Sequence, residues 1–402
     1  MDNSKNTNAP RPNSDRLVED LCAMVAMKSV NPFDNPPGPG LREEEFAKDL
    51  RTRMDALGLE TDQREVAPGR PNVWGRLKGR GTGATVMLAA HTDTVAAEGY
   101  PEAFNPIVAD GKVYGRGSCD MKAAIACYLE VVRLIQEGGI ELEGDLIICG
   151  VCDEEHTMIG SADAGQYGPQ ADYGIVGEPT ELAICPTHKG ELCLSFVTHG
   201  RAAHSSLPEN GINAVEAMGA VISAFSSYNQ ELQGIAEPHP FCGTGRFSMT
   251  VIRGGDFVSA IPARCEMEVD RRYLPGETAE GIKAEYRERL ESIKETRPDF
   301  DYTISDHSLN VLPLDIPIES PLVSAVQDAV RTVIDQEPEI TAFPGGTDAP
   351  NLGFPCVICG PGSIAQAHTI NEFVSIDQMV QATAIYLEAV QTLTSLPKPA
   401  AP

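Results

Sequence analysis

Several side chains that can bind metal ions stand just after short apolar runs of the chain. The runs, among them ATVMLAA and LIICGVC, are long enough for buried strands and too short for typical helices. The candidate ligands that follow them are His91, Asp93, Glu154, Glu155, Glu178 and His368. Loops that leave the carboxyl ends of neighbouring strands in an open α/β sheet converge at one edge. We therefore expect these side chains to meet in a single site.

Asp120, in GRGSCDMK, joins this group from the start of a helical pattern, where free backbone amides and the helix dipole stabilise a carboxylate. Two histidines and three or more carboxylates suffice for two cations that share a bridge. Two dications about 3.5–4 Å apart can polarise a carbonyl and lower the pKa of a bridging water. The crowded acids of DEE, residues 153–155, are then counter-charges.

Two acids are placed to assist rather than to bind metal. Asp93 lies on the same strand face as His91 if the strand continues, so it can hold the imidazole. A carboxylate that is not a ligand, Glu154 or Glu155, can accept a proton from water. Taken singly, a histidine at a strand end or a DEE turn is usually an ordinary surface feature, but their joint placement favours a metal site.

Composition narrows the class of protein. The chain has 402 residues, enough for a large core and two domains, and 58 Asp and Glu against 31 Lys and Arg give a formal charge of −27. Such a polyanion is repelled by nucleic acid and by anionic membrane surfaces, so neither partner is expected. The sequence contains no apolar stretch of the roughly 18 residues that cross a membrane. Residues 1–14 are polar and unlike a signal peptide, so we expect a disordered tail and a cytoplasmic protein.

Eleven cysteines are scattered through apolar runs, which is typical of reduced thiols packed as small hydrophobes. Cys149 and Cys152 form one CxxC pair, and Cys356 and Cys359 form another. This spacing is compatible with a zinc site or a redox pair. Because both pairs lie in or beside strand-like runs, we favour a structural role.

Strand-like and helical patterns alternate over residues 15–186. Helical spacing in residues 121–139, between the apolar runs 84–90 and 145–151, predicts a mostly parallel sheet with helices on both faces. The same buried α/β style returns at the carboxyl end, over 309–402. These two segments are predicted to form one catalytic domain.

Residues 187–308 have a different pattern. Alternating strands and amphipathic helices follow one another in the order strand, helix, strand, strand, helix, strand. This order predicts a split βαβ, ferredoxin-like α+β domain inserted into the first.

The motifs HTDTV, GRGSCDMKAA, DEEHTMIGS, GEPT, KGELCLSF, GRAAHSSLPENGINAV and GPGSIAQAHTINE occur in this order along the chain. Together they resemble the di-zinc amidohydrolase and peptidase family of acetylornithine deacetylase, succinyl-diaminopimelate desuccinylase, aminoacylase and glutamate carboxypeptidase. The resemblance covers roughly residues 15–395 and is strongest to the deacetylase and desuccinylase branch.

The resemblance implies two Zn²⁺ per subunit, held by His91, Asp120 and Glu178 and by Asp120, Glu155 and His368. Asp120 is then the bridge, Glu154 the general base, and Asp93 the acid that orients the first histidine. The oxygen-rich ligand set also accepts Co²⁺ or Mn²⁺.

The inserted domain is similar to the family's lid or dimerisation domain, which implies a homodimer. His204 would reach the partner subunit's active site and donate to the developing oxyanion. Arg272 matches the arginine that binds the substrate carboxylate, and Gly346, Thr347 and Asn213 match further substrate contacts.

The implied activity is hydrolysis of the amide bond of an N-acyl amino acid by a metal-activated water. A dipeptidase or carboxypeptidase of the same family is the alternative, and a non-catalytic protein that binds amino acids or peptides is a remoter one. Two positions depart from the family pattern: Ala123 replaces a glycine after DMK, and Ser259 replaces an asparagine that contacts substrate in some members. The acyl group, the side chain and the pathway stay open.

Overall fold

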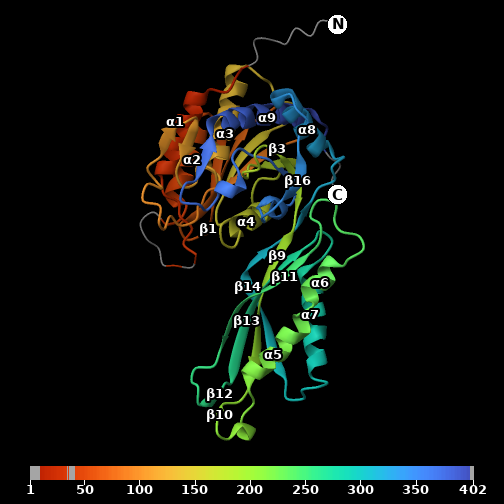
Figure 1. Cartoon of the computed structure of the whole chain (residues 1–402). Coiled ribbons are helices and arrows are strands. Elements are labelled where there is room, and N and C mark those ends of the chain that lie inside the picture. The colour runs from red at the N-terminus through yellow and green to blue at the C-terminus, as the bar shows by residue number, and fades with distance from the viewer. Residues whose placement is uncertain (1–9, 34, 36–40, 399–402) are drawn as a thin grey trace. The chain divides into compact units, whose positions relative to one another are not determined.

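The computed structural model describes residues 10–33, 35 and 41–398 (Figure 1). Its backbone contacts divide the chain into two compact units. The first comprises Met1–Thr187, Asp315–Phe343 and Thr347–Pro402, and the second comprises His188–Leu314 and Pro344–Gly346. Residues 1–9 of the predicted disordered tail lie outside the described residues, and Ser14 already begins the first helix.

The first unit is the α/β part of the chain. Its helices are α1 (Ser14–Ala26), α2 (Glu44–Ala56), α3 (Lys122–Glu137), α4 (Ile159–Tyr167), α8 (Pro321–Ile334) and α9 (Ile376–Ser395), with short 3-10 turns at Ala349–Leu352 and Ile364–Gln366. Its strands are β1 (Glu60–Ala67), β2 (Arg70–Leu77), β3 (Val86–His91), β4 (Ile107–Ala109), β5 (Lys112–Tyr114), β6 (Leu146–Val151), β7 (Tyr173–Val176), β8 (Ile184–His188), β15 (Leu314–Asp315), β16 (Ile340–Phe343), β17 (Cys356–Ile358) and β18 (Phe373–Ser375).

The main sheet has the order β1-β2-β6-β3-β7-β17-β8-β15, with β16 paired to β8. The central strands β6, β3, β7 and β17 are parallel to one another. All residues of β3 and β6 are buried, as expected for strands covered on both faces. The α/β class predicted from the alternating pattern is therefore confirmed.

The edges of this sheet are antiparallel. Strands β1 and β2 form a hairpin in which Ala67 pairs with Arg70, and Gly69 adopts a positive φ of 71° in the turn. A connection this short can join only antiparallel strands. On the other side, β17 runs antiparallel to β8.

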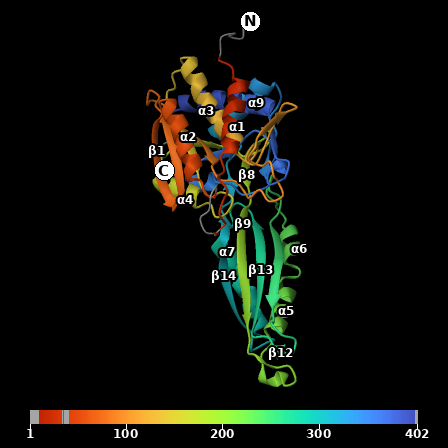
Figure 2. The same cartoon turned by 90° about the vertical axis from the view of Figure 1, so that its left-hand side faces the viewer.

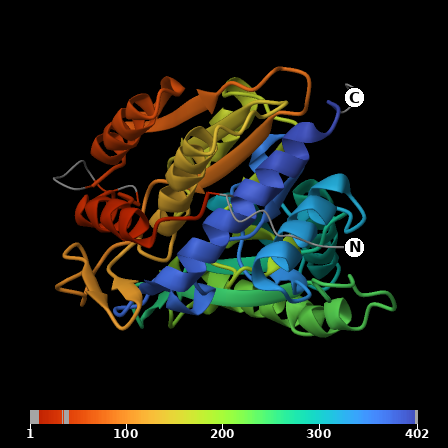
Figure 3. The ribbon, with the colours of Figure 1, turned by 90° about the horizontal axis from the view of Figure 1, so that it is seen from above.

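Helices cover both faces of the main sheet. Helices α3 and α9 pack against each other and against β3, and both lie above the sheet in Figure 1 and cross it in the view of Figure 3. Helix α4 contacts β2 and β6 and lies below the sheet in Figure 1. Most of α3 is buried all round, which explains its near-continuous apolar sequence. No helix in the described part of the chain is both long and apolar enough to span a membrane.

The second unit is an antiparallel sheet with helices on one side (Figure 2). It contains β9 (Gly190–His199), β10 (Ala203–His204), a 3-10 turn (Pro208–Asn210), α5 (Ala214–Phe225), α6 (Tyr228–Gln233), β11 (Arg246–Gly254), β12 (Ala260–Ile261), β13 (Arg264–Tyr273), α7 (Ala279–Ile293) and β14 (Asp301–Val311). The sheet order is β11-β13-β9-β14, and β10 pairs with β12 separately. Its elements follow in the predicted order, with the short additions α6, β10 and β12.

The core of the second unit lies between its sheet and its helices. Burial alternates along β13, so every second side chain faces the helices. Phe225 of α5 contacts the rings of Phe196, Phe247 and Tyr286, and these rings form the centre of the core.

Candidate active site

Three adjacent parallel strands deliver the first group of predicted ligands. His91 is the last residue of β3, Glu154 and Glu155 follow β6, and Glu178 follows β7. Because β6, β3 and β7 are neighbours with the same direction, their carboxyl ends open onto one edge of the sheet.

The ligand atoms of His91, Asp120 and Glu155 all lie within 4.8 Å of one another. His91 Nε2 is 2.9 Å from Asp120 Oδ1. His368 Nε2 is 2.9 Å from Glu155 Oε2 and 3.4 Å from Asp120 Oδ2. Four of the five predicted metal ligands are thus joined by direct contacts, with the Asp120 carboxylate between the two histidines.

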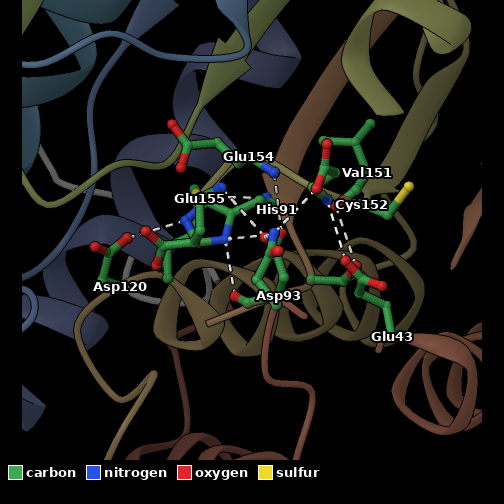
Figure 4. Close-up of polar contacts among 12 residues, drawn as sticks. Glu43, His91, Asp93, Asp120, Val151, Cys152, Glu154 and Glu155 are labelled. Atoms are coloured by element: carbon green, nitrogen blue, oxygen red, sulfur yellow. Dashed lines mark hydrogen bonds and ion pairs between the residues drawn. The ribbon is translucent and has the colours of Figure 1, made fainter. Parts of the chain in front are cut away.

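Asp93 is the hub of the surrounding network (Figure 4). Its carboxylate accepts hydrogen bonds from the backbone N–H groups of Glu154 and Glu155, each at 3.2 Å, and from the Asn31 amide at 2.7 Å. The carboxylate is 3.7 Å from His91 Nδ1, whereas the Asp93 carbonyl oxygen is 3.0 Å away. A carbonyl can only accept, so Nδ1 carries a proton and the imidazole is held by the Asp93 backbone. The Asp93 carboxylate positions the DEE loop.

Asp153 braces this loop from the inside. Asp153 is fully buried, and its backbone has a positive φ of 69°. Its carboxylate accepts hydrogen bonds from Asn31, Arg70 and Thr157. Arg70 also binds Glu43, and Glu43 accepts the Asp153 backbone N–H at 3.1 Å. The three acids of DEE therefore have different environments: Asp153 points into a buried network, while the other two face the ligand cluster.

Crowding of the carboxylates governs the electrostatics. Burial, followed by repulsion from other carboxylates, raises the pKa values of Glu154 and Glu178 well above their usual range and that of Glu155 to about 6. Burial would also raise the pKa of Asp120, but hydrogen bonds with His368 and His91 lower it. Burial would lower the pKa of His91, yet its contact with Asp120 and the charge of Glu178 raise it. The site thus concentrates negative charge that protons must balance when no cation does.

These residues fit a pair of metal ions. Imidazole nitrogen and carboxylate oxygen are the donors that zinc and related dications take in hydrolytic sites. Glu178 is only 3 % exposed, and its Oε1 has no hydrogen-bond partner among the described residues. A buried carboxylate oxygen without a donor is unfavourable unless a cation compensates for its desolvation.

Sequence reasoning missed several residues of the site. Asn31, Glu43 and Arg70 hold the DEE loop, and Glu372 binds the backbone of Asp120. Glu372 lies in the AHTINE motif, so its position four residues beyond His368 was the one available signal. The others come from segments distant in sequence and carry no local pattern.

Asp348 is a further buried acid of this unit. It lies in GGTDAP and is fully buried, and the nearby Ser161 hydroxyl donates to the Met158 carbonyl. Neither carboxylate oxygen has a hydrogen-bond partner within the described part of the chain. Burial raises the pKa of Asp348 to about 7.

His204, predicted to donate to an oxyanion, lies in β10 of the second unit and is exposed. The Ser206 backbone N–H donates to its Nδ1 at 3.1 Å, and the Ser206 hydroxyl lies 2.7 Å from the same atom. Because Nδ1 accepts, the neutral ring carries its proton on Nε2, which is then a hydrogen-bond donor.

Arg272 lies at the other end of the second unit. His204 is next to β12, which leads directly into Arg264, and about 26 Å of strand β13 separates Arg264 from Arg272 at roughly 3.3 Å per residue. Arg272 contacts Glu191 at 2.7 Å and Asp270 at 3.0 Å, and its side chain is 34 % exposed.

The remaining predicted substrate contacts have local structural roles. Asn213 caps α5 by accepting from the N–H groups of Val215 and Glu216, and its amide group donates to the Glu216 side chain. Gly346, in the second unit, packs so closely on Val311 that a Cβ would lie 2.5 Å from a valine methyl group. Thr347, in the first unit, accepts the Ala349 N–H at 3.3 Å. A part for Asn213, Gly346 and Thr347 in substrate binding stays a prediction.

The cysteine pairs are packed in the core. All eleven cysteines are free, and Cys149, Cys152, Cys356 and Cys359 are buried. Burial raises the pKa of the Cys149 and Cys359 thiols to about 12. Buried thiols with raised pKa values are poor nucleophiles, and none of these four cysteines belongs to a group of described residues that could hold a metal ion, which favours packing as small hydrophobes.

An α/β sheet with clustered histidines and carboxylates at its carboxyl edge, interrupted by a smaller α+β unit, defines a class of metal-dependent hydrolases. Residues 87–392 match Peptidase family M20/M25/M40, and the chain belongs to this family. This match confirms the predicted family and the predicted class of metal-dependent hydrolase.

Curated relatives cover most of the chain. An acetylornithine deacetylase from Aliivibrio salmonicida is 32% identical over 338 residues, which are 79% of this chain and 83% of that protein. An N-formyl-4-amino-5-aminomethyl-2-methylpyrimidine deformylase from Bacillus subtilis is 29% identical over 396 residues, 90% of this chain and 92% of that protein.

Solved structures share the fold. The aminopeptidase PepT from Bacillus cereus superposes with a TM-score of 0.78 at 19% identity, covering 95% of this chain and 99% of that one. A dinuclear metal-binding peptidase of family M20 from Bacillus subtilis has a TM-score of 0.70 at 15% identity, covering 94% and 97% of the two chains.

Proposed function

We propose that this protein is a di-metal N-deacylase, which hydrolyses the amide bond between a small acyl group and the amino group of an amino acid. The observation that carries the proposal is the contact chain His91, Asp120, His368, Glu155, which places a carboxylate between two histidines. His91, Asp120 and Glu178 would hold one cation, and Asp120, Glu155 and His368 the other. The donor set suits Zn²⁺, and Co²⁺ or Mn²⁺ are compatible with it.

When bound, the two cations supply polarisation of the scissile carbonyl and a lowered pKa for a coordinated water. Glu154 is the general base: its backbone N–H is held by Asp93, and the residue is half-buried beside the ligand cluster. Burial, the largest cause, and repulsion from Glu178 raise the pKa of Glu154 when no cation is present, which favours its protonated form. Positive charge nearby favours the ionised form, so the loaded site has the carboxylate that accepts a proton from water and returns it to the leaving amine.

Arg272 and His204 would complete the substrate site as binders of the carboxylate and of the oxyanion. The length of β13 separates the two residues in one subunit, so a small substrate contacts both only if they come from different subunits. The position of β11 at the edge of its sheet supports a homodimer through the second unit, because an edge strand can pair with another chain and β11 exposes Met249 and Ile252 by 39 % and 54 %.

The relatives favour deacylation over peptide cleavage. The curated relatives described above remove acetyl and formyl groups, whereas the peptidases are similar in fold at below 25% identity. The Arg272 side chain is 34 % exposed beside its partners Glu191 and Asp270, so it can also bind a substrate carboxylate. This favours an acylated amino acid over an acylated amine without a carboxylate.

The experiment is a substrate panel with metal-loaded protein. Acetyl-, formyl- and succinyl-amino acids, N-formyl-aminomethylpyrimidine and dipeptides are compared by kcat/KM. We expect acylated amino acids to be cleaved best and Arg272→Lys to raise KM for them. If only dipeptides are cleaved, the protein is a peptidase and not a deacylase. If no compound of the panel is cleaved, the non-catalytic alternative, a protein that binds amino acids or peptides, is favoured.

Action of His204 across the dimer has a separate test. The Glu154→Gln and His204→Ala variants should each be inactive. The first keeps His204 and the second keeps Glu154. Mixing them should restore up to about a quarter of the wild-type activity, because half of the randomly formed dimers contain one complete site. No recovery from demonstrably exchanged subunits would place His204 in its own subunit's site or outside the reaction.

A further inference from the structure

Glu372 is buried at the junction of two segments that carry predicted metal ligands. It lies four residues beyond His368 and is 0 % exposed. Its Oε1 accepts the backbone N–H groups of Cys119 at 2.9 Å and of Asp120 at 3.0 Å. Its Oε2 accepts from Arg116 Nη1 at 2.6 Å. The Glu372 carbonyl oxygen also accepts the Gly115 N–H, so the whole residue is clamped to the 115–120 segment.

We propose that Glu372 is the positioning residue of the bridging carboxylate: it holds the Asp120 backbone in register with the loop of His368. This inference rests on the proposed di-metal function. Asp120 and Glu372 are 252 residues apart in sequence, and Asp120 would be the ligand that the two cations share. A carboxylate that accepts two consecutive backbone N–H groups fixes that peptide in position and orientation.

Only a carboxylate satisfies all three donors. Both oxygens of Glu372 accept hydrogen bonds, one from the backbone and one from Arg116. A glutamine has the same shape but a single acceptor, so its NH₂ group must face either the two N–H groups or the guanidinium. Because the charged guanidinium is the stronger donor, the amide oxygen should turn to Arg116 and leave the two N–H groups facing NH₂. Glu372→Gln is therefore expected to misplace Asp120 while it changes the side-chain volume very little.

Glu130 provides a matched control in the same unit. It is also 0 % exposed, accepts the Asn13 backbone N–H at 3.0 Å and pairs with Arg16 at 2.6 Å. It lies in the middle of α3, and its contact residues Asn13 and Arg16 are not predicted metal ligands. Glu130→Gln and Glu372→Gln thus remove the same kind of buried, arginine-paired charge, and only the second should affect the metal site.

The test measures metal affinity by competition with a chromophoric chelator, and hydrogen exchange of the peptide that contains Cys119 and Asp120 in metal-free protein. Glu372→Gln should weaken Zn²⁺ binding by about 10–100-fold, which is the usual effect of losing a residue that orients a ligand. It should also speed exchange in that peptide and lower kcat more than it raises KM. Glu130→Gln should leave affinity, exchange and kcat unchanged.

A double variant tests the geometry further. Arg116→Met combined with Glu372→Gln removes the competing donor, so the amide oxygen can face both backbone N–H groups, and affinity should recover relative to Glu372→Gln alone. Wild-type affinity in Glu372→Gln, with a loss of thermal stability equal to that of Glu130→Gln, would overturn the positioning role and leave the proposed function standing. Absence of metal binding by the unaltered protein would overturn both.

Discussion

His91 Nε2 and Asp120 Oδ1 lie 2.9 Å apart, so two predicted ligands of the same cation share a hydrogen bond. Nδ1 of His91 already donates to the Asp93 carbonyl, which leaves Nε2 as the atom that faces Asp120. A proton between these atoms occupies the direction in which a cation would bind, and cation and proton compete for the same lone pairs.

Metal binding should therefore release protons. Hydrogen bonds with Asp120 and Glu155 raise the pKa of His368 to about 10, so in the metal-free protein this ring is protonated at pH 7 and must lose its proton to bind a cation. Apparent Zn²⁺ affinity should increase about tenfold per pH unit for each proton released as the pH rises from 6 to 9. Calorimetry in buffers of different ionisation enthalpy measures the protons released. An affinity independent of pH in this range would contradict the ligand assignment of His368.

Glu154 and Glu155 are adjacent in sequence but should respond differently to the same change. Glu154→Gln should lower kcat by about 10²–10⁴-fold with full metal content, because the proton acceptor is lost and the ligands remain. Glu155→Gln should lower the metal content, because Glu155 contacts His368 directly. Elemental analysis and single-turnover rates on the same samples distinguish the two roles. Equal metal loss in both variants would argue against Glu154 as a base.

Arg70 should be important for stability although it is not a predicted ligand. Arg70→Met leaves Glu43 and Asp153 buried without their cation, so urea denaturation should show a loss on the order of 3–5 kcal/mol. Adding Glu43→Gln should recover part of that loss. Arg64, whose pair with Asp163 is exposed, is the comparison: Arg64→Met should change stability by about 1 kcal/mol or less. A similar small effect at Arg70 would show that the DEE loop does not depend on this network.

Asp348 should make the metal-free protein less stable at high pH. Its pKa rises from 3.8 to about 7 on folding, so the folded state holds a proton that the unfolded state has released between these values. The free energy of unfolding therefore falls as the pH rises from about 4 to 7. Above pH 7 the deficit is constant, on the order of 4 kcal/mol at most.

Asp348→Asn should remove this penalty, with no gain near pH 4 and the full gain at pH 8. Urea midpoints of chelator-treated protein at the two pH values measure the difference. Asp62→Asn, at an exposed position, is the control: its effect on the urea midpoint should be the same at both pH values. A gain of equal size at both pH values would mean that titration of Asp348 is not its cause.

Sequence patterns were sufficient for the fold class and for the order of elements in the inserted unit, because buried strands and amphipathic helices have distinct periods. They did not indicate the antiparallel edges of the main sheet. The direction of β8 against β17 depends on pairing between segments more than 150 residues apart, and nothing local to either strand specifies it.

For the site, the sequence by itself determined which side chains could serve as ligands and base, since His91, Glu154, Glu155 and Glu178 follow recognisable strands. Only the tertiary structure decided how they are held: that the Asp93 carboxylate binds the DEE backbone, that Asp153 points into the protein toward Arg70, and that Glu372 clamps Asp120. The physical reason is the separation along the sequence of the residues that interact. Secondary structure follows from neighbours a few residues away, whereas these hydrogen bonds join segments that meet only when the sheet has closed and water has left the site.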